Sequence, residues 1–470
     1  MKVPARPPGP PQRFLTGSFR EFRTDLLGFL ERSARQYGDV VSFRLGRRPC
    51  LLVNHPDLIE SVLIKNSRNF VKPFAFRFTR AVLGNGLLTS EGSFWLRQRR
   101  LAAGAFQAER IAGYGPDMVS SAVRMLANWR DGETRDIHAD MMQVTLDIVA
   151  RTLFGADVTE QSHEIGESLL LALRSFGANF SRRIPLPSWI PTSGNRKARA
   201  AVRGLNGVVR QIIDRRRHET EPRTDLLSLM LHARDEDGSQ MTDEQLLDEV
   251  RTFLLAGHET TAITLSWTLY LLANHPHEQA RLHAELDTVL AGRLPEVADL
   301  ARLPVAGRIV QEAMRLYPPA FMIGRENVAE FELGGYTIPA GTTIFMSHWV
   351  MHRDGRFYDQ PEQFQPERWA APSIQSLPKM AYFPFGAGPR VCIGNSFAMM
   401  ESVLLLATIG RQWSLAPVAD HPIRLAPVLT LRPRYGIKVV LHRRPIAETD
   451  PREAHGEASL AVQPSSSADV

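Results

Sequence analysis

The sequence has little cysteine and no apolar run long enough for a membrane. Two cysteines, Cys50 and Cys392, are too few for a secreted scaffold built from disulfides, and they fit a reducing cytosol. The longest nearly apolar stretch, Thr261 to Ala273, is shorter than the roughly 20 residues that a bilayer-spanning helix needs. Residues 1–11 carry proline and arginine but no apolar core, unlike a signal peptide. We therefore expect a cytoplasmic protein without a transmembrane anchor.

A strong charge of one sign is also missing. The chain has 56 Lys plus Arg against 50 Asp plus Glu, a net charge of +6, and its basic residues are dispersed among acidic ones. This balance is too weak to indicate a nucleic-acid partner. It still favours docking of an acidic protein on one face.

What the chain has is enough apolar material for a large core. It is 470 residues long, with 44% hydrophobic and 23% charged residues. Helical patterns dominate, and short alternating runs indicate a few strands, so the fold class is mainly α with a small β region. We expect a proline-rich N-terminal arm over 1–18, a single catalytic domain over 19–445 and a disordered tail over 446–470. We expect a monomer.

A few elements are predicted individually. Thr242 and Gln245 form a capping-box pattern, and the helical pattern that follows continues to about Asn274, which is about 50 Å of helix. The pattern over 19–37 also predicts a helix. The alternating segments 41–45 and 50–53, separated by a turn, predict a hairpin near the N-terminus.

One segment combines a single cysteine with flexible residues. Residues 385–394 hold three glycines, a proline and Cys392, and an apolar helical run follows. A cysteine just before a helix meets unpaired backbone N–H groups and the positive end of the dipole, both of which favour the metal-binding thiolate. Taken without its context, such a cysteine is more often buried and unreactive.

The context resembles the haem-binding signature of the cytochrome P450 family, F-x-x-G-x-R-x-C-x-G. The matching residues are Phe385, Gly388, Arg390, Cys392 and Gly394. The resemblance implies that Cys392 is the proximal ligand of the iron, where a thiolate favours O–O cleavage. It also implies that Arg390 binds a haem propionate, and that Phe385 and Gly394 belong to the cofactor-binding loop. The expected cofactor is haem b, iron protoporphyrin IX, lying between the long helix and the helix after the cysteine loop.

The middle of the long helix carries polar residues where a core helix would have leucines. The segment Ala256-Gly257-His258-Glu259-Thr260-Thr261 resembles the family's oxygen-activating signature, [AG]-G-x-[DE]-T-[TS]. The resemblance implies that Glu259 and Thr260 are the catalytic acid and alcohol that deliver protons during oxygen activation. The alternative is that Glu259 is solvated on an outer face and the threonines only pack.

Two further segments match the family in the expected order. Glu312 and Arg315 share a helix face, although such a pair alone contributes only about 0.3–0.5 kcal/mol at a surface. Downstream, residues 364–369 resemble the family's P-E-R-F element, with Trp369 in place of phenylalanine. The resemblance implies a buried structural triad of Glu312, Arg315 and Arg368.

The resemblance also extends to the rim of the haem. Trp95 and Arg99 resemble the family's W-x-x-x-R, which implies that both bind a propionate. Arg325 follows the Pro318-Pro319 bend, where family members place another propionate arginine. For each arginine the alternative is a solvated surface charge.

Together these resemblances imply a haem-dependent monooxygenase of the soluble bacterial type. It would insert one oxygen atom from O2 into an apolar organic substrate, by hydroxylation or epoxidation, and the A-G-H-E-T-T form favours fatty acids or terpenoids. Candidate substrate-lining segments are the phenylalanine-rich residues 70–90, Leu169 to Phe180, Ala256, and Ala320 to Ile323.

The chain shows no flavin or iron–sulfur motif, so electrons from NAD(P)H would arrive through a separate ferredoxin and ferredoxin reductase. Basic residues such as Arg97, Arg100 and Lys379 are candidates for the docking surface. Two alternatives remain, a peroxide-driven peroxygenase and a non-catalytic haem sensor. The first would lack the Glu259–Thr260 pair, and the second has no need of Thr260.

Overall fold

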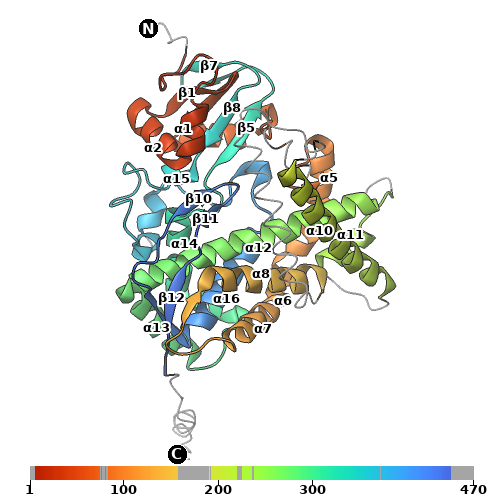
Figure 1. The fold of residues 1–470 in the computed structure, drawn as a ribbon, viewed down its shortest axis with the longest axis vertical. Coiled ribbons are helices and arrows are strands. Elements are labelled where there is room, and N and C mark those ends of the chain that lie inside the picture. The colour runs from red at the N-terminus through yellow and green to blue at the C-terminus, as the bar shows by residue number, and fades with distance from the viewer. Residues whose placement is uncertain are drawn as a thin grey trace, which may run out of the picture.

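The computed structural model describes residues 6–445 apart from 75, 77–79, 81–82, 157–189, 191, 220–224, 235–237 and 371. Strands β1 (Val40–Leu45), β5 (Ile323–Asn327), β7 (Tyr336–Ile338) and β8 (Thr343–Met346) lie at the end that holds the N-terminal residues (Figure 1). Helices fill most of the rest of the molecule around one long helix, with β12 (Lys438–Arg443) among them. The predicted tail over 446–470 and residues 1–5 of the predicted arm lie outside the described residues. The described part of the arm runs along the first strand, where Ser42 N donates to Pro8 O at 2.7 Å.

The helices vary from one turn to nearly nine. The longer ones are α2 (Leu26–Tyr37), α5 (Gly92–Ala103), α7 (Gly115–Leu126), α8 (Ile137–Phe154), α10 (Ser193–His218), α12 (Asp243–Asn274), α13 (Pro276–Leu290), α14 (Pro304–Leu316) and α16 (Asn395–Gly410). The shorter ones are α1 (Phe19–Thr24), α3 (Pro56–Glu60), α6 (Ala108–Gly113), α11 (Leu226–His232) and α15 (His348–Met351). A π-turn and six 3-10 turns add η1 (Ser61–Lys65), η2 (Ser67–Asn69), η3 (Gly104–Phe106), η4 (Val297–Arg302), η5 (Pro366–Trp369), η6 (Ser373–Ser376) and η7 (Gly388–Arg390).

Helix α12 confirms the predicted long helix. Thr242 and Gln245 form both reciprocal bonds of the capping box, which satisfies two backbone donors at the helix start. The helix has 32 residues and crosses the molecule in Figure 1. Most of its side chains are buried, because α8, α10, α14 and α16 all pack against it. Any site at its middle is therefore inside the protein.

The strands of the described residues form four small sheets. They are β1 (Val40–Leu45), β2 (Arg48–Val53), β3 (Phe70–Val71), β4 (Thr134–Asp136), β5 (Ile323–Asn327), β6 (Phe331–Leu333), β7 (Tyr336–Ile338), β8 (Thr343–Met346), β9 (Trp413–Pro417), β10 (Leu425–Pro427), β11 (Leu431–Pro433) and β12 (Lys438–Arg443). The largest sheet has the order β1-β2-β8-β5-β3, a second has β4-β12-β9, and β6-β7 and β10-β11 are hairpins. The predicted N-terminal hairpin is confirmed, with Val40 opposite Val53 in an antiparallel register. Strand β8 then joins β2 in parallel, Cys50 opposite Thr343.

The helix predicted over 19–37 is wrong as a single element. The chain breaks at Asp25, which has φ −149°, and continues as α2. The Asp25 carboxylate accepts a hydrogen bond from Gly28 N at 3.2 Å, so this residue caps the second helix. None of the described helices has the length and apolarity that crossing a membrane requires.

Candidate active site

The cysteine loop is a tight turn that needs glycine at two positions. Cys392 N donates to Phe385 O at 2.9 Å, which closes the loop on itself. Gly386 and Gly388 have φ of +71° and +70°, a region that other residues rarely adopt. At Gly388 a Cβ atom would also lie 2.0 Å from Leu63 O of η1. The loop is therefore packed against η1 and presents Cys392 just before α16.

The Cys392 side chain is solvent-accessible, although protein surrounds it closely on its other sides. Burial raises the pKa of the thiol above its ordinary value, while the Gly394 N–H and the Arg99 guanidinium act in the opposite direction. The Gly394 N–H acts in the direction expected from the helix start, but desolvation of the sulfur outweighs it. A metal ion at the sulfur would reverse this balance.

The middle of α12 presents two small residues and one hydroxyl on a short accessible face. Ala256 is exposed and Gly257 and Thr260 are half-buried, although most other residues along this stretch are buried. The Thr260 hydroxyl donates to Ala256 O at 2.6 Å and keeps its lone pairs for another donor. A Cβ at Gly257 would lie 3.0 Å from the Val149 side chain, so this glycine lets α8 pack closely. The exposed positions border a space that the described side chains do not fill.

Glu259 is not solvated on an outer face, which excludes that alternative. It is 2% exposed, and its Oε1 accepts hydrogen bonds from the Thr430 hydroxyl and from Arg432 Nε, the latter at 2.6 Å. Both partners lie on the β10–β11 hairpin. The hydrogen bonds of the described residues do not join Glu259 to the Thr260 hydroxyl. The predicted acid and alcohol are thus adjacent in sequence but bound to different partners.

A cluster of cations lies where the propionate residues were predicted. Arg390 pairs with Glu91, and its guanidinium carbon lies 4.2 Å from the centre of the Trp95 ring. Lys72 donates to Ser90 O at 2.9 Å, while burial and the nearby Arg390 lower its pKa to about 7. Burial, followed by the charge of Arg390, also lowers the pKa of Arg325 to about 10.

This cluster fits the carboxylates of a haem. Lys72, Arg325 and Arg390 share Glu91 as their nearby carboxylate, so desolvated positive charge is in excess. Two propionates would supply the missing negative charge. Together with the accessible sulfur of Cys392, the residues present fit an iron porphyrin held between the cysteine loop and α12. Sequence reasoning missed Lys72 and Glu91, because neither belongs to a recognisable motif.

Arg99 is placed differently from its predicted role. Its Nη1 donates to Val391 O at 2.7 Å, which ties α5 to the cysteine loop beside the sulfur. Trp95, one turn earlier, packs with Arg390 instead. The structure brings both residues to the cysteine loop, while a propionate contact by Arg99 stays a prediction.

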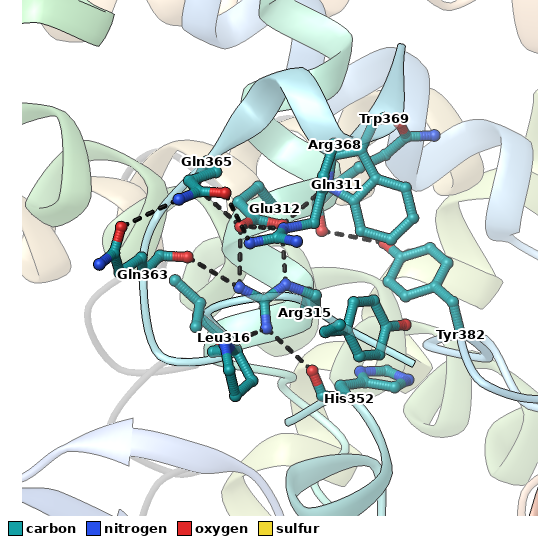
Figure 2. A network of polar contacts seen from close by, with 12 residues as sticks. Gln311, Glu312, Arg315, Leu316, His352, Gln363, Gln365, Arg368, Trp369 and Tyr382 are labelled. Atoms are coloured by element: carbon teal, nitrogen blue, oxygen red, sulfur yellow. Dashed lines mark hydrogen bonds and ion pairs between the residues drawn. The ribbon is translucent and has the colours of Figure 1, made fainter. Parts of the chain in front are cut away.

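Glu312, Arg315 and Arg368 meet in a buried network (Figure 2). Arg315 donates to both carboxylate oxygens of Glu312 at 2.8 Å, and Arg368 Nε donates to Oε1 at 2.9 Å. The remaining Arg315 donors bind backbone carbonyls, including His352 O at 2.9 Å. The arginine donors thus find acceptors on Glu312 and on backbone carbonyls, and the network ties α14 to η5.

Trp369 takes part in this network, which its position in the motif did not indicate. Its indole N–H donates to Glu312 Oε2 at 2.9 Å, and Gln365 N donates to Oε1 at 2.9 Å. The phenylalanine of the family pattern has no such donor. The substitution noted in the sequence therefore adds a hydrogen bond to the buried carboxylate.

Comparisons with known proteins agree with this geometry. The family described as Cytochrome P450 matches residues 7–440. The chain is 37% identical to a cyclooctat-9-en-7-ol 5-monooxygenase of Streptomyces melanosporofaciens, over 88% of this chain and 93% of that protein. It is 37% identical to a pentalenene oxygenase of Streptomyces avermitilis, over 84% of this chain and 89% of that protein. The solved cytochrome P450DA heme domain superposes with a TM-score of 0.86 at 28% identity, covering 94% and 98% of the two chains.

These findings confirm the predicted fold class, cofactor and type of reaction. The haem is of the b type, and its electrons come from NAD(P)H through a redox partner. The family model covers residues 7–440, and the superposition covers almost the whole length of both chains. Together they lead to one assignment. The chain belongs to the cytochrome P450 family and is a haem-dependent monooxygenase of apolar substrates.

Proposed function

We propose that this cytochrome P450 hydroxylates a polycyclic terpenoid, with Cys392 as the iron ligand and Glu259 and Thr260 as the proton-delivering pair. The observation that supports the site is the exposed interior face of α12 at Ala256 and Thr260. The substrate class rests on the two Streptomyces relatives, whose names specify cyclooctat-9-en-7-ol and pentalenene. Fatty acids, the other class considered from the sequence, have no support among these relatives.

Different residues bind the haem and deliver protons. When bound, the haem supplies the chemistry that inserts one oxygen atom from O2 into a C–H bond. Cys392 anchors the iron, and Lys72, Arg325 and Arg390 hold the propionates by charge-assisted hydrogen bonds. The Thr260 hydroxyl would donate a proton during oxygen activation, and Glu259 would supply the proton that restores this hydroxyl.

The described part of the substrate site is apolar. Ala320, Met322 and Ile323 are half-buried, and Phe321 is buried with its carbonyl bound to the Ser347 hydroxyl at 3.2 Å. The predicted lining segment Leu169 to Phe180 lies outside the described residues. An apolar wall with few polar groups fits a hydrocarbon-like substrate, which is oriented by shape.

The proposed substrate class is tested by spectral binding and product analysis. The purified enzyme is mixed with pentalenene, with cyclooctat-9-en-7-ol and with palmitate. We expect a shift toward high spin with a terpenoid, and a hydroxylated product when NADPH, ferredoxin and ferredoxin reductase are added. Turnover of palmitate without any terpenoid product contradicts the substrate class. Turnover with peroxide alone, equal to that with the redox chain, contradicts the proton-delivery role.

We further propose that a ferredoxin docks next to the cysteine loop, on a surface formed by α5 and by the segment that precedes this loop. Arg100 and Lys379 are exposed, whereas Arg97 is half-buried and donates to the Ser239 hydroxyl at 3.1 Å. Because Arg99 on the same helix contacts Val391 O, this face lies next to the iron ligand. Replacing Arg100 and Lys379 with Glu should raise the ferredoxin KM several-fold at low salt. Arg203→Glu, at an exposed position on α10, is the matched control. An equal rise in the ferredoxin KM in this variant contradicts the proposed docking surface.

A further inference from the structure

The β10–β11 hairpin holds the carboxylate of Glu259, and this contact has a consequence for regulation. We infer that the hairpin couples occupation of the substrate site to proton supply, with Arg432 and Thr430 as positioning residues. The inference rests on the proposed role of Glu259. An apolar ligand against the hairpin tip would draw Thr430 and Arg432 away from Glu259 and free its carboxyl to turn toward Thr260.

The hairpin is fixed from two sides. Leu431 N donates to Pro319 O at 2.9 Å, and the Trp267 indole N–H donates to Leu431 O at 2.9 Å. Trp267 lies two turns after Glu259 on α12, and Pro319 immediately precedes the apolar lining segment Ala320 to Ile323. Strand β11 therefore bridges the helix that carries the acid and the segment proposed to contact substrate.

The tip of the hairpin joins an exposed residue to the hydroxyl that binds Glu259. It consists of Val428, Leu429 and Thr430, between β10 and β11. Val428 is 42% exposed, Leu429 is half-buried, and Val428 N donates to Thr430 O at 3.2 Å across the turn. Thr430 thus shares one tight turn with an exposed apolar residue, so pressure on Val428 reaches the hydroxyl that binds Glu259.

The present geometry holds the acid in a closed position. The Thr430 hydroxyl and Arg432 Nε both donate to Glu259 Oε1, and Arg432 is only 14% exposed. Burial lowers the pKa of His138 to about 4 and that of His258 to about 3, so these two neighbours are neutral. Arg432 is therefore the cation that Glu259 faces among the described residues. In the closed position the carboxyl points to the hairpin rather than to Thr260.

Release of the acid completes a balanced proton transfer. Freed Glu259 takes a proton from hydronium, which leaves water, and passes it to the hydroxyl oxygen of Thr260. Thr260 gives its own hydroxyl proton to the oxygen atom of O2 that leaves as water, so both side chains return to their starting protonation states. Holding the acid closed without a substrate would limit proton delivery in turnovers that form no product.

The Glu259–Arg432 pair should influence how tightly a ligand binds. If a ligand must break the Glu259–Arg432 pair, part of its binding free energy is consumed in doing so. Removing either partner in advance should then tighten binding, and removing both should tighten it no further. Coupling free energies of this kind correspond to about 5-fold to 150-fold in affinity.

The experiment compares the variants Arg432→Gln, Glu259→Gln and their combination, each loaded with haem and checked for the 450 nm band of the reduced CO complex. Spectral dissociation constants are measured for pentalenene and for clotrimazole, a bulky apolar azole that does not require a terpenoid substrate. We expect about 5-fold or greater tightening in each single variant and no further gain in the double variant. Arg434→Gln, which removes an exposed charge two residues along the same hairpin, should change affinity less than 2-fold.

Unchanged or weaker ligand binding by Arg432→Gln overturns the inference. Additive effects of the two substitutions in the double variant also overturn it. If Arg432→Gln does not retain haem, Thr430→Val keeps the charge and removes one donor, and it should still tighten binding. A crystal structure with ligand should show Glu259 and Arg432 separated by more than about 4 Å, and an intact pair beside a bound ligand also overturns the inference. Failure of pentalenene to bind the wild-type enzyme counts against the terpenoid proposal alone, because the clotrimazole series decides the coupling separately.

Discussion

Replacing Glu312 with glutamine should destabilise the protein far more than the same replacement at Glu367, fifty-five residues later. Glu312 is fully buried and accepts from the Arg315, Arg368, Trp369 and Gln365 donors. Glutamine keeps one acceptor oxygen and turns the other position into an NH2 group that faces donors. Arg315, itself fully buried, then loses its counter-charge.

The expected magnitude follows from this burial. Breaking a buried ion pair from one side costs about 3–5 kcal/mol, because the remaining charge is left uncompensated. Glu367 also pairs with two arginines, Arg281 and Arg308, but it is 48% exposed. Exposed pairs contribute about 0.2–1 kcal/mol. The two substitutions change the same chemical group in neighbouring segments, so burial is the variable that differs.

Urea unfolding of the haem-loaded protein measures the difference. Tryptophan fluorescence reports the fold and the 450 nm band of the CO complex reports the haem site. Glu312→Gln should lower the unfolding midpoint strongly, while Glu367→Gln should stay near wild type. Equal midpoints for the two variants refute the view that the triad is a buried structural lock.

Three further predictions test other parts of the site. Burial and the nearby Arg390 lower the pKa of Lys72 to about 7, below the ordinary lysine value, and propionates would raise it. Haem binding then takes up a proton above pH 7, so haem transfer to apomyoglobin should accelerate from pH 7 to 9. The acceleration should be smaller in Lys72→Met. The Cys392 thiol releases a proton on haem binding and so acts in the opposite sense, but it is present in both proteins. An equal acceleration in the wild type and in Lys72→Met therefore contradicts the assignment. Gly388→Ala, with φ of +70° and a Cβ directed at Leu63 O, should reduce haem incorporation, whereas Gly355→Ala, in open space, should not. Thr260→Ala should at least halve product per NADPH and raise peroxide, while Thr264→Ala one turn later should not; equal coupling in the two variants refutes the role of Thr260.

The sequence predicted the parts of this protein that local pattern determines. The capping box at Thr242 fixes the start of α12 by neighbouring residues, and the turn of the β1–β2 hairpin is equally local. The cysteine loop was found because its glycines and Cys392 are constrained within ten residues. The break at Asp25 was missed because the apolar pattern continues through it, and only the backbone reveals the cap.

The contacts that sequence reasoning missed join residues far apart in the chain. Arg432 lies 173 residues after Glu259, and Arg390 lies 299 residues after Glu91. No spacing rule connects such positions, because the fold alone decides which strand lies beside which helix. Trp369 was noticed as a deviation from a motif, but its hydrogen bond to Glu312 depends on how η5 packs on α14.

The two buried charge clusters show which part of the molecule depends on its cofactor. Around Glu312 each described charge has a partner from the protein itself, so this network can form whether or not haem is bound. Around Glu91 burial lowers the pKa of Lys72, Arg325 and Arg390, and the charge of Arg390 lowers that of Lys72 and Arg325 further. Desolvated like charges oppose folding until a counter-charge arrives. The rim of the site should therefore be the region that the haem stabilises most, and the α14–η5 lock should stay closed when the haem is lost.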